Sequence, residues 1–84
     1  MKKTLLVQVK NPMETLMRIT TMLQRRGCEL QGIIYHAGKE SSFNLQLTVG
    51  ADSEDLMNNV VLQMKRFQDV FDVAEESTLV RERM

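Results

Sequence analysis

The spacing of the hydrophobic residues in this chain changes back and forth between two residues and three to four residues. It is most regular in FNLQLTV (43–49), where apolar and polar residues alternate. Strict alternation predicts a β-strand with one buried face and one polar face. In DSEDLMNNVVLQMKRF (52–67) the apolar residues instead recur at the spacing of one helical face, which predicts a helix. The order of these two patterns along the chain therefore limits the folds that it can adopt.

Six elements are expected from the two spacings. They are a strand at 4–9, a helix from Pro12 that stops at Gly27, strands at 29–36 and 43–49, a helix within 52–67, and a strand that begins near Val70. The β-α-β-β-α-β order predicts an α+β protein of the ferredoxin-like type, in which a four-stranded antiparallel sheet carries both helices on one face. Right-handed crossovers predict the strand order 4-1-3-2 or its usual equivalent. The segment 77–84 is expected either to extend the last strand or to fray.

The stretch KNPMETLMRI (10–19) marks the start of the first helix. Asn11 is expected as the N-cap, with Pro12 at the first helical position and Glu14 three residues after the cap. This pattern predicts a capping box, in which side chains use the free N–H groups of the first turn and stabilise the helix by about 1 kcal/mol. At the other end, Gly27 is expected in the left-handed conformation that commonly ends a helix.

Each helix carries an apolar stripe that is expected to face the sheet. The stripes are Leu16, Ile19, Met22 and Leu23 in the first helix and Leu56, Met57, Val60, Met64 and Phe67 in the second. Asp52 or Ser53 is expected to cap the second helix. Met13 and Met17 lie beside the first stripe, and Leu62 lies off the second. Because exposed, flexible apolar side chains suit a surface that docks on another protein, these three are the candidates for partner contact.

Length and composition predict one small globular domain, 1–84. Eleven basic and eleven acidic residues cancel, so charge gives no argument for binding nucleic acid or an anionic membrane. Cys28 is the single cysteine, which excludes an intrachain disulfide and is expected to be a small buried side chain. The apolar run near the N-terminus is too short for a signal peptide or a membrane span. The chain is therefore expected in the cytoplasm, and its small core favours oligomerisation or docking on a partner.

The residue patterns of several other activities are missing. A metal carrier of this fold needs paired cysteines, and an RNA-binding sheet needs aromatic residues on its open face. The open face is expected to carry polar residues instead: Gln8, Asn44, Gln46 and Thr48. His36 has no nucleophile or second histidine at a recognisable spacing, and is interpreted as a solvated residue near a turn. Neither a catalytic residue nor a metal site is predicted.

The run VQVKNPMETLMRITTMLQRRGCELQGI (7–33) has a distinctive arrangement. A strand leads into Asn11, a helix carries LMRI (16–19), and RRG (25–27) ends that helix directly before the next strand. This arrangement resembles the ACT domain, and within that family the small regulatory subunit of acetolactate synthase (acetohydroxyacid synthase). The sequence PMETL (12–16) is similar to the short, single-domain variant of that subunit, the isozyme II type. The likeness in topology covers the whole chain, whereas the matching residues are confined to about its first third.

The resemblance implies a regulatory protein rather than an enzyme. It implies a non-catalytic subunit that binds and activates a large catalytic subunit of acetolactate synthase, in the biosynthesis of branched-chain amino acids. The large subunit would carry thiamine diphosphate, FAD and magnesium, and this chain would carry no cofactor. The resemblance also implies a homodimer that forms by edge-to-edge pairing of two sheets. A branched-chain amino-acid effector, where one is bound, lies between the first loop of one subunit and the neighbouring subunit.

The effector residues that the resemblance implies are Asn11, Met13, Glu14, Thr15 and Glu29. Several positions depart from the pattern of valine-sensitive relatives. These have Gly in place of Glu14, a small polar residue in place of Met17, and Asn in place of Glu29. A carboxylate at position 14 would repel the carboxylate of an amino acid and fill its space. The site is therefore expected to be degenerate, with weak or absent feedback by valine.

Two other functions stay open beside the activating subunit. The first is a free-standing ACT homodimer that senses an amino acid and regulates another protein. The second is a small enzyme of ferredoxin-like fold, which the missing nucleophile and acid–base pair disfavour. A sensor is expected to be stabilised by its amino acid without any enzyme present. An activating subunit is expected to co-purify with a large partner and to raise its rate.

Overall fold

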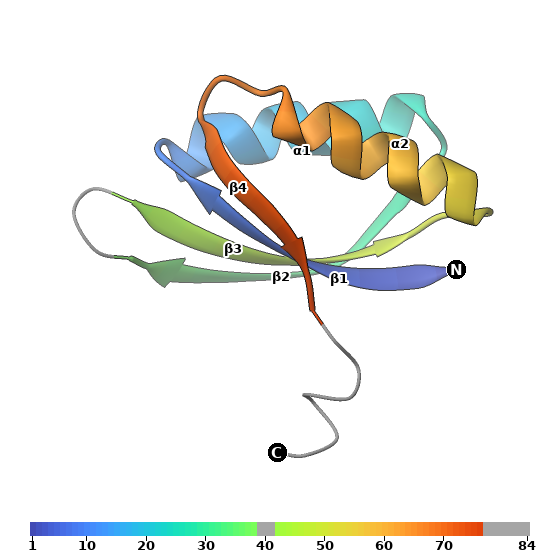
Figure 1. The fold of residues 1–84 in the computed structure, drawn as a ribbon, viewed down its shortest axis with the longest axis horizontal. Coiled ribbons are helices and arrows are strands. Elements are labelled where there is room, and N and C mark those ends of the chain that lie inside the picture. Colours follow the sequence, from blue (N-terminus) through green and yellow to red (C-terminus); the bar gives the residue numbers. More distant parts are fainter. Residues whose placement is uncertain (39–41, 77–84) are drawn as a thin grey trace, which may run out of the picture.

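The computed structural model describes residues 1–38 and 42–76, which form four strands and two helices (Figure 1). In order, the elements are β1 (Lys2–Val9), α1 (Pro12–Arg25), β2 (Glu29–Ala37), β3 (Phe43–Gly50), α2 (Glu54–Lys65) and β4 (Val70–Glu75). The predicted βαββαβ order is confirmed. The expectation for 77–84 lies outside the described residues. Neither helix within the described ranges is long and apolar enough to cross a membrane.

The strands form one antiparallel sheet in the order β2-β3-β1-β4. This is the predicted order 4-1-3-2, read from the other edge. The central strand β1 pairs with β3 along its whole length, from Lys2 opposite Gly50 to Val9 opposite Phe43. Both helices lie on the same face of the sheet (Figure 1), with α1 packed on β2 and β3 and α2 packed on β4. The sheet therefore has one covered face, one open face and two edge strands, β2 and β4.

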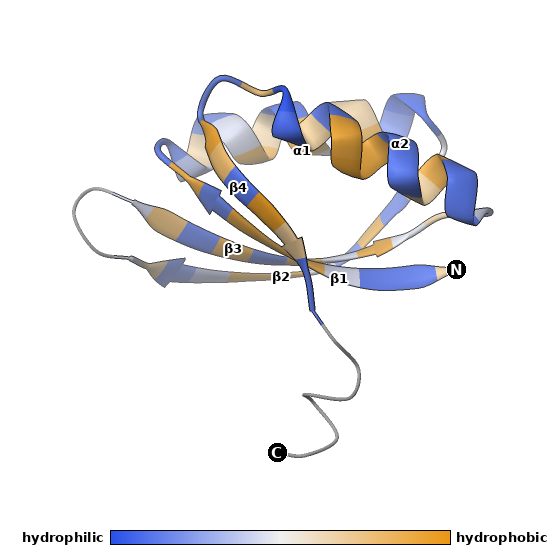
Figure 2. Cartoon of the chain, viewed as in Figure 1, coloured by the Kyte–Doolittle hydropathy of each residue, from blue (hydrophilic) through white to orange (hydrophobic). Residues whose placement is uncertain are grey.

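The core lies between the sheet and the helix layer, and hydrophobic residues alternate with hydrophilic ones along the strands (Figure 2). The central strands bury Leu5, Val7, Val9, Leu45, Leu47 and Val49, and α2 buries Met57, Val60 and Met64. In α1 the buried residues are Thr15, Ile19 and Leu23, which are four residues apart and lie in one line along the helix. The predicted stripe, which was limited to apolar residues, did not include Thr15. Leu16 and Met22 are only partly buried and flank that line.

The ends of the helices differ from the prediction in one respect. Gly27 has a φ of 73° directly after α1, as predicted. Of the two candidate caps for α2, Ser53 makes the hydrogen bond, accepting it from the N–H of Leu56. Asn11 occupies the N-cap position of α1, but its side chain makes no capping hydrogen bond, so the predicted capping box is wrong. The backbone also differs between the two N-cap residues, since ψ is 91° at Asn11 and 161° at Ser53.

Strand β2 is an exposed edge. Its pairing with β3 is irregular between Leu30 and Gly32, which marks a β-bulge. Beyond the bulge, Ile33, Ile34 and Tyr35 are each about half exposed, at 46%, 48% and 52%. An edge strand also offers unpaired N–H and C=O groups along its outer side. This edge of the sheet is therefore suited to pairing with another strand.

Candidate functional site

The turn between β1 and α1 holds the first group of predicted site residues. The N–H of Thr15 donates a hydrogen bond of 3.0 Å to the C=O of Asn11, which begins the helix. The N–H of Lys10 donates to the C=O of Asp69 at 2.9 Å and ties the turn to the segment before β4. A shallow cavity of about 260 Å³ lies here, lined by Asn11, Pro12, Met13 and Glu14. Three of the five predicted effector residues therefore meet at one cavity.

The start of the helix sets the chemistry of this cavity. Pro12 has no N–H and Thr15 uses its own N–H within the helix, so the N–H groups of Met13 and Glu14 are the first-turn donors that the Asn11 side chain leaves uncapped. The helix dipole also favours negative charge there. Glu14 already supplies a negative charge in this turn, and its side chain is exposed. An amino-acid carboxylate approaching the cavity would therefore meet free donors and a repelling carboxylate together.

Thr15 is placed differently from the other predicted effector residues. Its side chain is fully buried and does not line the cavity at the turn. Within the part of the chain that the structure describes, Oγ1 of Thr15 has no hydrogen-bond partner. A buried hydroxyl that lacks a partner destabilises a protein by about 1–3 kcal/mol. Thr15 therefore belongs to the core of the domain.

Glu29, the fifth predicted effector residue, is the first residue of β2 and follows the end of α1. The 14 residues of α1 span roughly 21 Å, so Glu29 and Asn11 lie near opposite ends of the helix. Glu29 lines two other cavities, of about 350 Å³ and 200 Å³, with Cys28 beside the first and Gly50 beside the second. Within one chain, the structure does not bring Glu29 to the residues at the first turn of α1.

Cys28 lies next to Glu29, and its thiol is buried, as expected of a small core side chain. Burial raises the pKa of the Cys28 thiol, while the positive charge of Arg26 acts in the opposite direction and the negative charge of Asp52 adds to the rise. A buried thiol with a raised pKa stays protonated, and only the thiolate is an effective nucleophile or metal ligand. The environment of Cys28 therefore fits a structural role.

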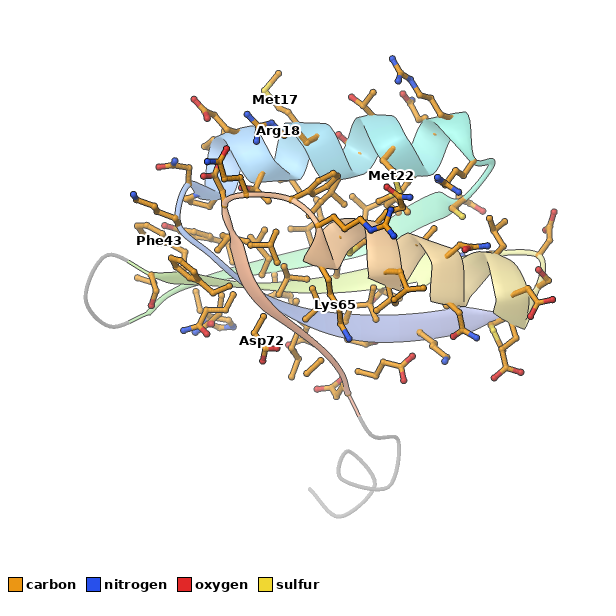
Figure 3. The ribbon with its side chains drawn as sticks, turned by 45° about the horizontal axis from the view of Figure 1, so that its top comes forward. Met17, Arg18, Met22, Phe43, Lys65 and Asp72 are labelled. Atoms are coloured by element: carbon orange, nitrogen blue, oxygen red, sulfur yellow. The ribbon has the colours of Figure 1, made fainter. Side chains whose placement is uncertain are left out.

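The three predicted partner-contact residues are all exposed on the helix layer. Met13, Met17 and Leu62 have exposed fractions of 74%, 68% and 55%. Met17 projects outward from α1, away from the sheet (Figure 3). Both helices therefore present large apolar side chains to solvent, on the side of the molecule opposite the open face of the sheet.

A larger groove, which sequence reasoning missed, lies between α1 and α2. It has a volume of about 660 Å³ and is lined by Met17, Arg18, Thr21, Met22, Arg25, Arg26, Gln63 and Phe67. In the sequence, Arg25 and Arg26 are accounted for by their place in the last turn of a helix, where positive charge interacts favourably with the helix dipole. The available signal is the spacing of Arg18, Met22 and Arg25, which are four and three residues apart and so share one side of the helix.

The chain is similar to known proteins in both sequence and structure. The sequence pattern of the ACT domain matches residues 11–73, and no curated protein sequence matches the chain significantly. The ACT domain of GTP pyrophosphokinase from Chlorobium tepidum is similar in structure, with a TM-score of 0.71, 16% identity, and 89% of this chain and 96% of that chain covered. The C-terminal domain of MgtC from Mycobacterium tuberculosis has a TM-score of 0.71 and 15% identity. The match covers 89% of this chain and 84% of that domain. A homoserine dehydrogenase from Thiobacillus denitrificans has a TM-score of 0.72 and 14% identity over 89% of this chain and 17% of its own length.

The two kinds of likeness support different conclusions. At these low identities the structural neighbours show the fold alone, which is the predicted ferredoxin-like arrangement. The sequence pattern covers most of the chain, from Asn11 through α1, β2, β3 and α2 into β4, and leaves out β1. The chain therefore belongs to the ACT domain family of regulatory domains.

Proposed function

We propose that this chain is a non-catalytic small subunit that binds and activates the large catalytic subunit of acetolactate synthase, in the cytoplasmic biosynthesis of branched-chain amino acids. Membership of the ACT family supports a regulatory role, and the sequences LMRI (16–19) and RRG (25–27) support this particular subunit. The observation that carries the proposal is a contrast between two surfaces. The turn expected to hold an effector carries the Glu14 carboxylate, whereas the helix layer exposes Met17 and Leu62. Such surfaces favour docking on a protein over sensing of an amino acid.

Under this proposal the chemistry belongs to the partner. The catalytic subunit carries thiamine diphosphate, FAD and magnesium, and the small subunit contributes no cofactor. Activation then arises from contact between the two proteins. A small subunit that binds the active conformation of the catalytic subunit more tightly than the inactive one shifts the population toward the active conformation.

We also propose that two copies of the chain pair edge to edge through β2. The two edges of the sheet differ, because β2 has nine residues and β4 has six. The longer edge also exposes Ile33, Ile34 and Tyr35, whose burial would favour association. Pairing of two β2 strands would supply partners for the outer N–H and C=O groups and join two sheets into one.

Pairing through β2 would bring Glu29 of one copy to the end of the sheet where the first turn of α1 of the other copy lies. An antiparallel pairing centred on the middle residue of β2 sets Glu29 of one copy opposite Ala37 of the other. Ala37 pairs with Phe43, and Phe43 pairs with Val9, two residues before Asn11. Glu29 of one copy would then lie at the end of the joined sheet where α1 of the other copy begins. The predicted effector residues would thus lie at the same end of the joined sheet, whereas within one chain they lie near opposite ends of α1.

Both halves of such a composite site are acidic. Glu14 stands in the first turn of α1, and Glu29 stands at the start of β2. The resemblance gives these positions to Gly and Asn in valine-sensitive relatives. Two carboxylates would repel the carboxylate of an amino acid, although they could accept hydrogen bonds from its amino group. We therefore propose that a branched-chain amino acid binds this chain weakly or not at all.

A free-standing ACT homodimer that senses an amino acid is the alternative function. The uncapped N–H groups at the start of α1 favour it, because they are donors suited to a carboxylate. This alternative predicts that an amino acid raises the Tm of the purified chain with no enzyme present. The activating subunit predicts stabilisation by the catalytic subunit instead.

The proposal is tested by mixing the purified chain with an acetolactate synthase catalytic subunit from the same organism. We expect the two to co-elute in size-exclusion chromatography, and the rate of acetolactate formation from pyruvate to rise with the concentration of the chain until it saturates. Leu62→Lys is expected to fold and to activate less, because it places a charge on the exposed helix layer. Absence of both binding and activation by the wild-type chain would overturn the proposal, and an amino-acid-dependent rise in Tm would favour the sensor.

A further inference from the structure

We propose that the groove between α1 and α2 binds an acidic amphipathic helix of a partner protein. The inference rests on the proposed function in one respect, namely that the partner is then the catalytic subunit of acetolactate synthase. The groove shares no lining residue with the cavity at the first turn of α1. It also lies on the helix layer and not on the β2 edge that is proposed to join two copies. One chain can therefore pair with a second copy and dock on a different protein at the same time.

The groove combines an apolar floor with a flexible rim. Met22 lies between the two helices (Figure 3) and is partly buried, as is Phe67 after the end of α2. Met17 stands at the rim, mostly exposed. The volume of about 660 Å³ lies in the range of sites that bind whole ligands. Methionine side chains adapt their shape to apolar surfaces, which is typical of grooves that receive an amphipathic helix.

The charges around the groove have one sign. Arg18, Arg25 and Arg26 line it, and no carboxylate is among the lining residues that the structure describes. Arg18 contacts Asp69 at 3.5 Å, and in the described parts of the chain neither Arg25 nor Arg26 forms an ion pair. Because the chain as a whole has no net charge, this is a local excess of positive charge. Carboxylates of a partner would supply acceptors for the guanidinium groups, which bind carboxylates in a bidentate geometry.

The spacing of the arginines matches the repeat of a helix. Arg18 and Arg25 are seven residues apart on one side of α1, with Met22 between them, so their positions along the helix differ by roughly 10 Å. Acidic residues seven apart on a partner helix have the same separation. Apolar residues between them would face Met22 and Phe67. An acidic amphipathic helix therefore satisfies the charges and the apolar floor with one surface.

Other anionic partners satisfy only part of this surface. A small carboxylate would contact one arginine and leave Met22 and Phe67 uncovered. Nucleic acid binds through an extended basic surface and through stacking on aromatic residues. Within residues 1–38 and 42–76, the groove is lined by three arginines and one aromatic residue, Phe67. The combination of apolar floor and spaced cations favours a polypeptide.

The test uses the full chain labelled with ¹³C in its methionine methyl groups and titrated with the unlabelled catalytic subunit. Met17 and Met22 report on the groove, Met13 reports on the first turn of α1, and Met57 and Met64 report on the core. We expect the signals of Met17 and Met22 to shift or broaden first and most strongly. A response confined to Met13, or spread equally over the core residues, would overturn the inference.

Two double variants provide a matched comparison. Arg25 and Arg26 are the last residue and the C-cap of α1, and Lys65 and Arg66 hold the same two positions in α2. Lys65 and Arg66 do not line the groove, and Lys65 points away from α1 (Figure 3). R25E/R26E is expected to weaken binding at least about tenfold, and K65E/R66E to change it by less than about twofold. Both variants change the same charges at a helix end, so a loss of folding would show equally in both thermal melts.

The outcomes separate this inference from the proposed function. If the wild-type chain binds the catalytic subunit and R25E/R26E binds equally well, the groove inference fails and the proposed function stands. If the wild-type chain does not bind the catalytic subunit, the proposed function fails. The groove is then probed with a designed helical peptide of about 20 residues, with leucines on one face and glutamates beside them. Peptide binding that shifts the methyl signals of Met17 and Met22 and is lost in R25E/R26E supports the groove as a helix-binding site. Absence of peptide binding overturns the groove inference.

Discussion

The hydroxyl oxygen of Ser53 lies 3.1 Å from the backbone nitrogen of Leu56 and accepts its hydrogen bond, which caps α2. Asn11 occupies the same position at the start of α1 without such a bond. Ser53→Ala is expected to lower the free energy of unfolding by about 1 kcal/mol, and Asn11→Ala by less than about half of that. Urea denaturation followed by circular dichroism measures both. An equal loss in the two variants would contradict the difference between the two caps.

Gly27 ends α1 with a φ of 73°, and a Cβ atom added there meets no other atom within 4 Å. The cost of a side chain is therefore conformational rather than steric. Gly27→Ala is expected to lower the free energy of unfolding by about 1–2 kcal/mol. Gly32→Ala is the control, since its Cβ would lie in ordinary contact with Thr48 at 3.6 Å and its φ is not positive. A smaller loss for Gly27→Ala than for Gly32→Ala, in the same urea measurement, would contradict this explanation.

The order of the elements was predictable because hydrophobic spacing determines which side of each element is buried. Alternation in 43–49 and the stripe of α2 both specify one face, and the structure buries those faces. The end of α1 was predictable for a similar reason, since Gly27 tolerates a conformation that other residues avoid. These features depend on residues close together in sequence.

The features that the sequence did not reveal depend on geometry between elements. Whether the Asn11 side chain caps α1 depends on local backbone and side-chain geometry, which the residue type alone does not determine. Thr15 is buried because it lies in line with Ile19 and Leu23, although its polarity predicts exposure. The groove between α1 and α2 requires the relative placement of two helices, which no local pattern describes.

Thr15→Val tests whether the buried hydroxyl lacks a partner, as it does among the described residues. Valine has nearly the same shape as threonine. It replaces the hydroxyl, whose burial without a hydrogen bond is unfavourable, with a methyl group. We expect the free energy of unfolding to rise by about 1 kcal/mol or more. Thr4→Val, where Oγ1 lies 3.4 Å from Oγ1 of Thr48, is the control and is expected to gain less. A decrease for Thr15→Val would show that its hydroxyl is stabilising.

Ile33→Lys tests the proposed pairing of two copies through β2. Ile33 lies near the middle of the exposed edge, and a lysine on an edge strand opposes pairing with another strand. Sedimentation is expected to show a dimer for the wild-type chain and a monomer for Ile33→Lys. Phe71→Lys places the same charge on the other edge strand, where Phe71 is 57% exposed, and is expected to remain dimeric. A monomer for Phe71→Lys alone would move the interface to β4.

Glu14→Gln tests why an amino-acid effector is expected to bind weakly. Glutamine keeps the size of the side chain and removes the charge from the first turn of α1. Two carboxylates about 4 Å apart repel one another by about 1 kcal/mol in water, so valine is expected to bind Glu14→Gln about fivefold more tightly than the wild-type chain. Chemical shift titrations measure affinities in the millimolar range that is expected here.

Glu54→Gln is the control for Glu14→Gln, since Glu54 stands in the first turn of α2 and its charge is not part of the composite site. Valine affinity is expected to be unchanged in this variant. Equal gains in both variants would indicate a general effect of net charge, and micromolar binding of valine by the wild-type chain would show that Glu14 does not obstruct the site. If the affinity rises only in Glu14→Gln, the first turn of α1 keeps the donors of an effector site, and the Glu14 charge is the group that opposes the ligand.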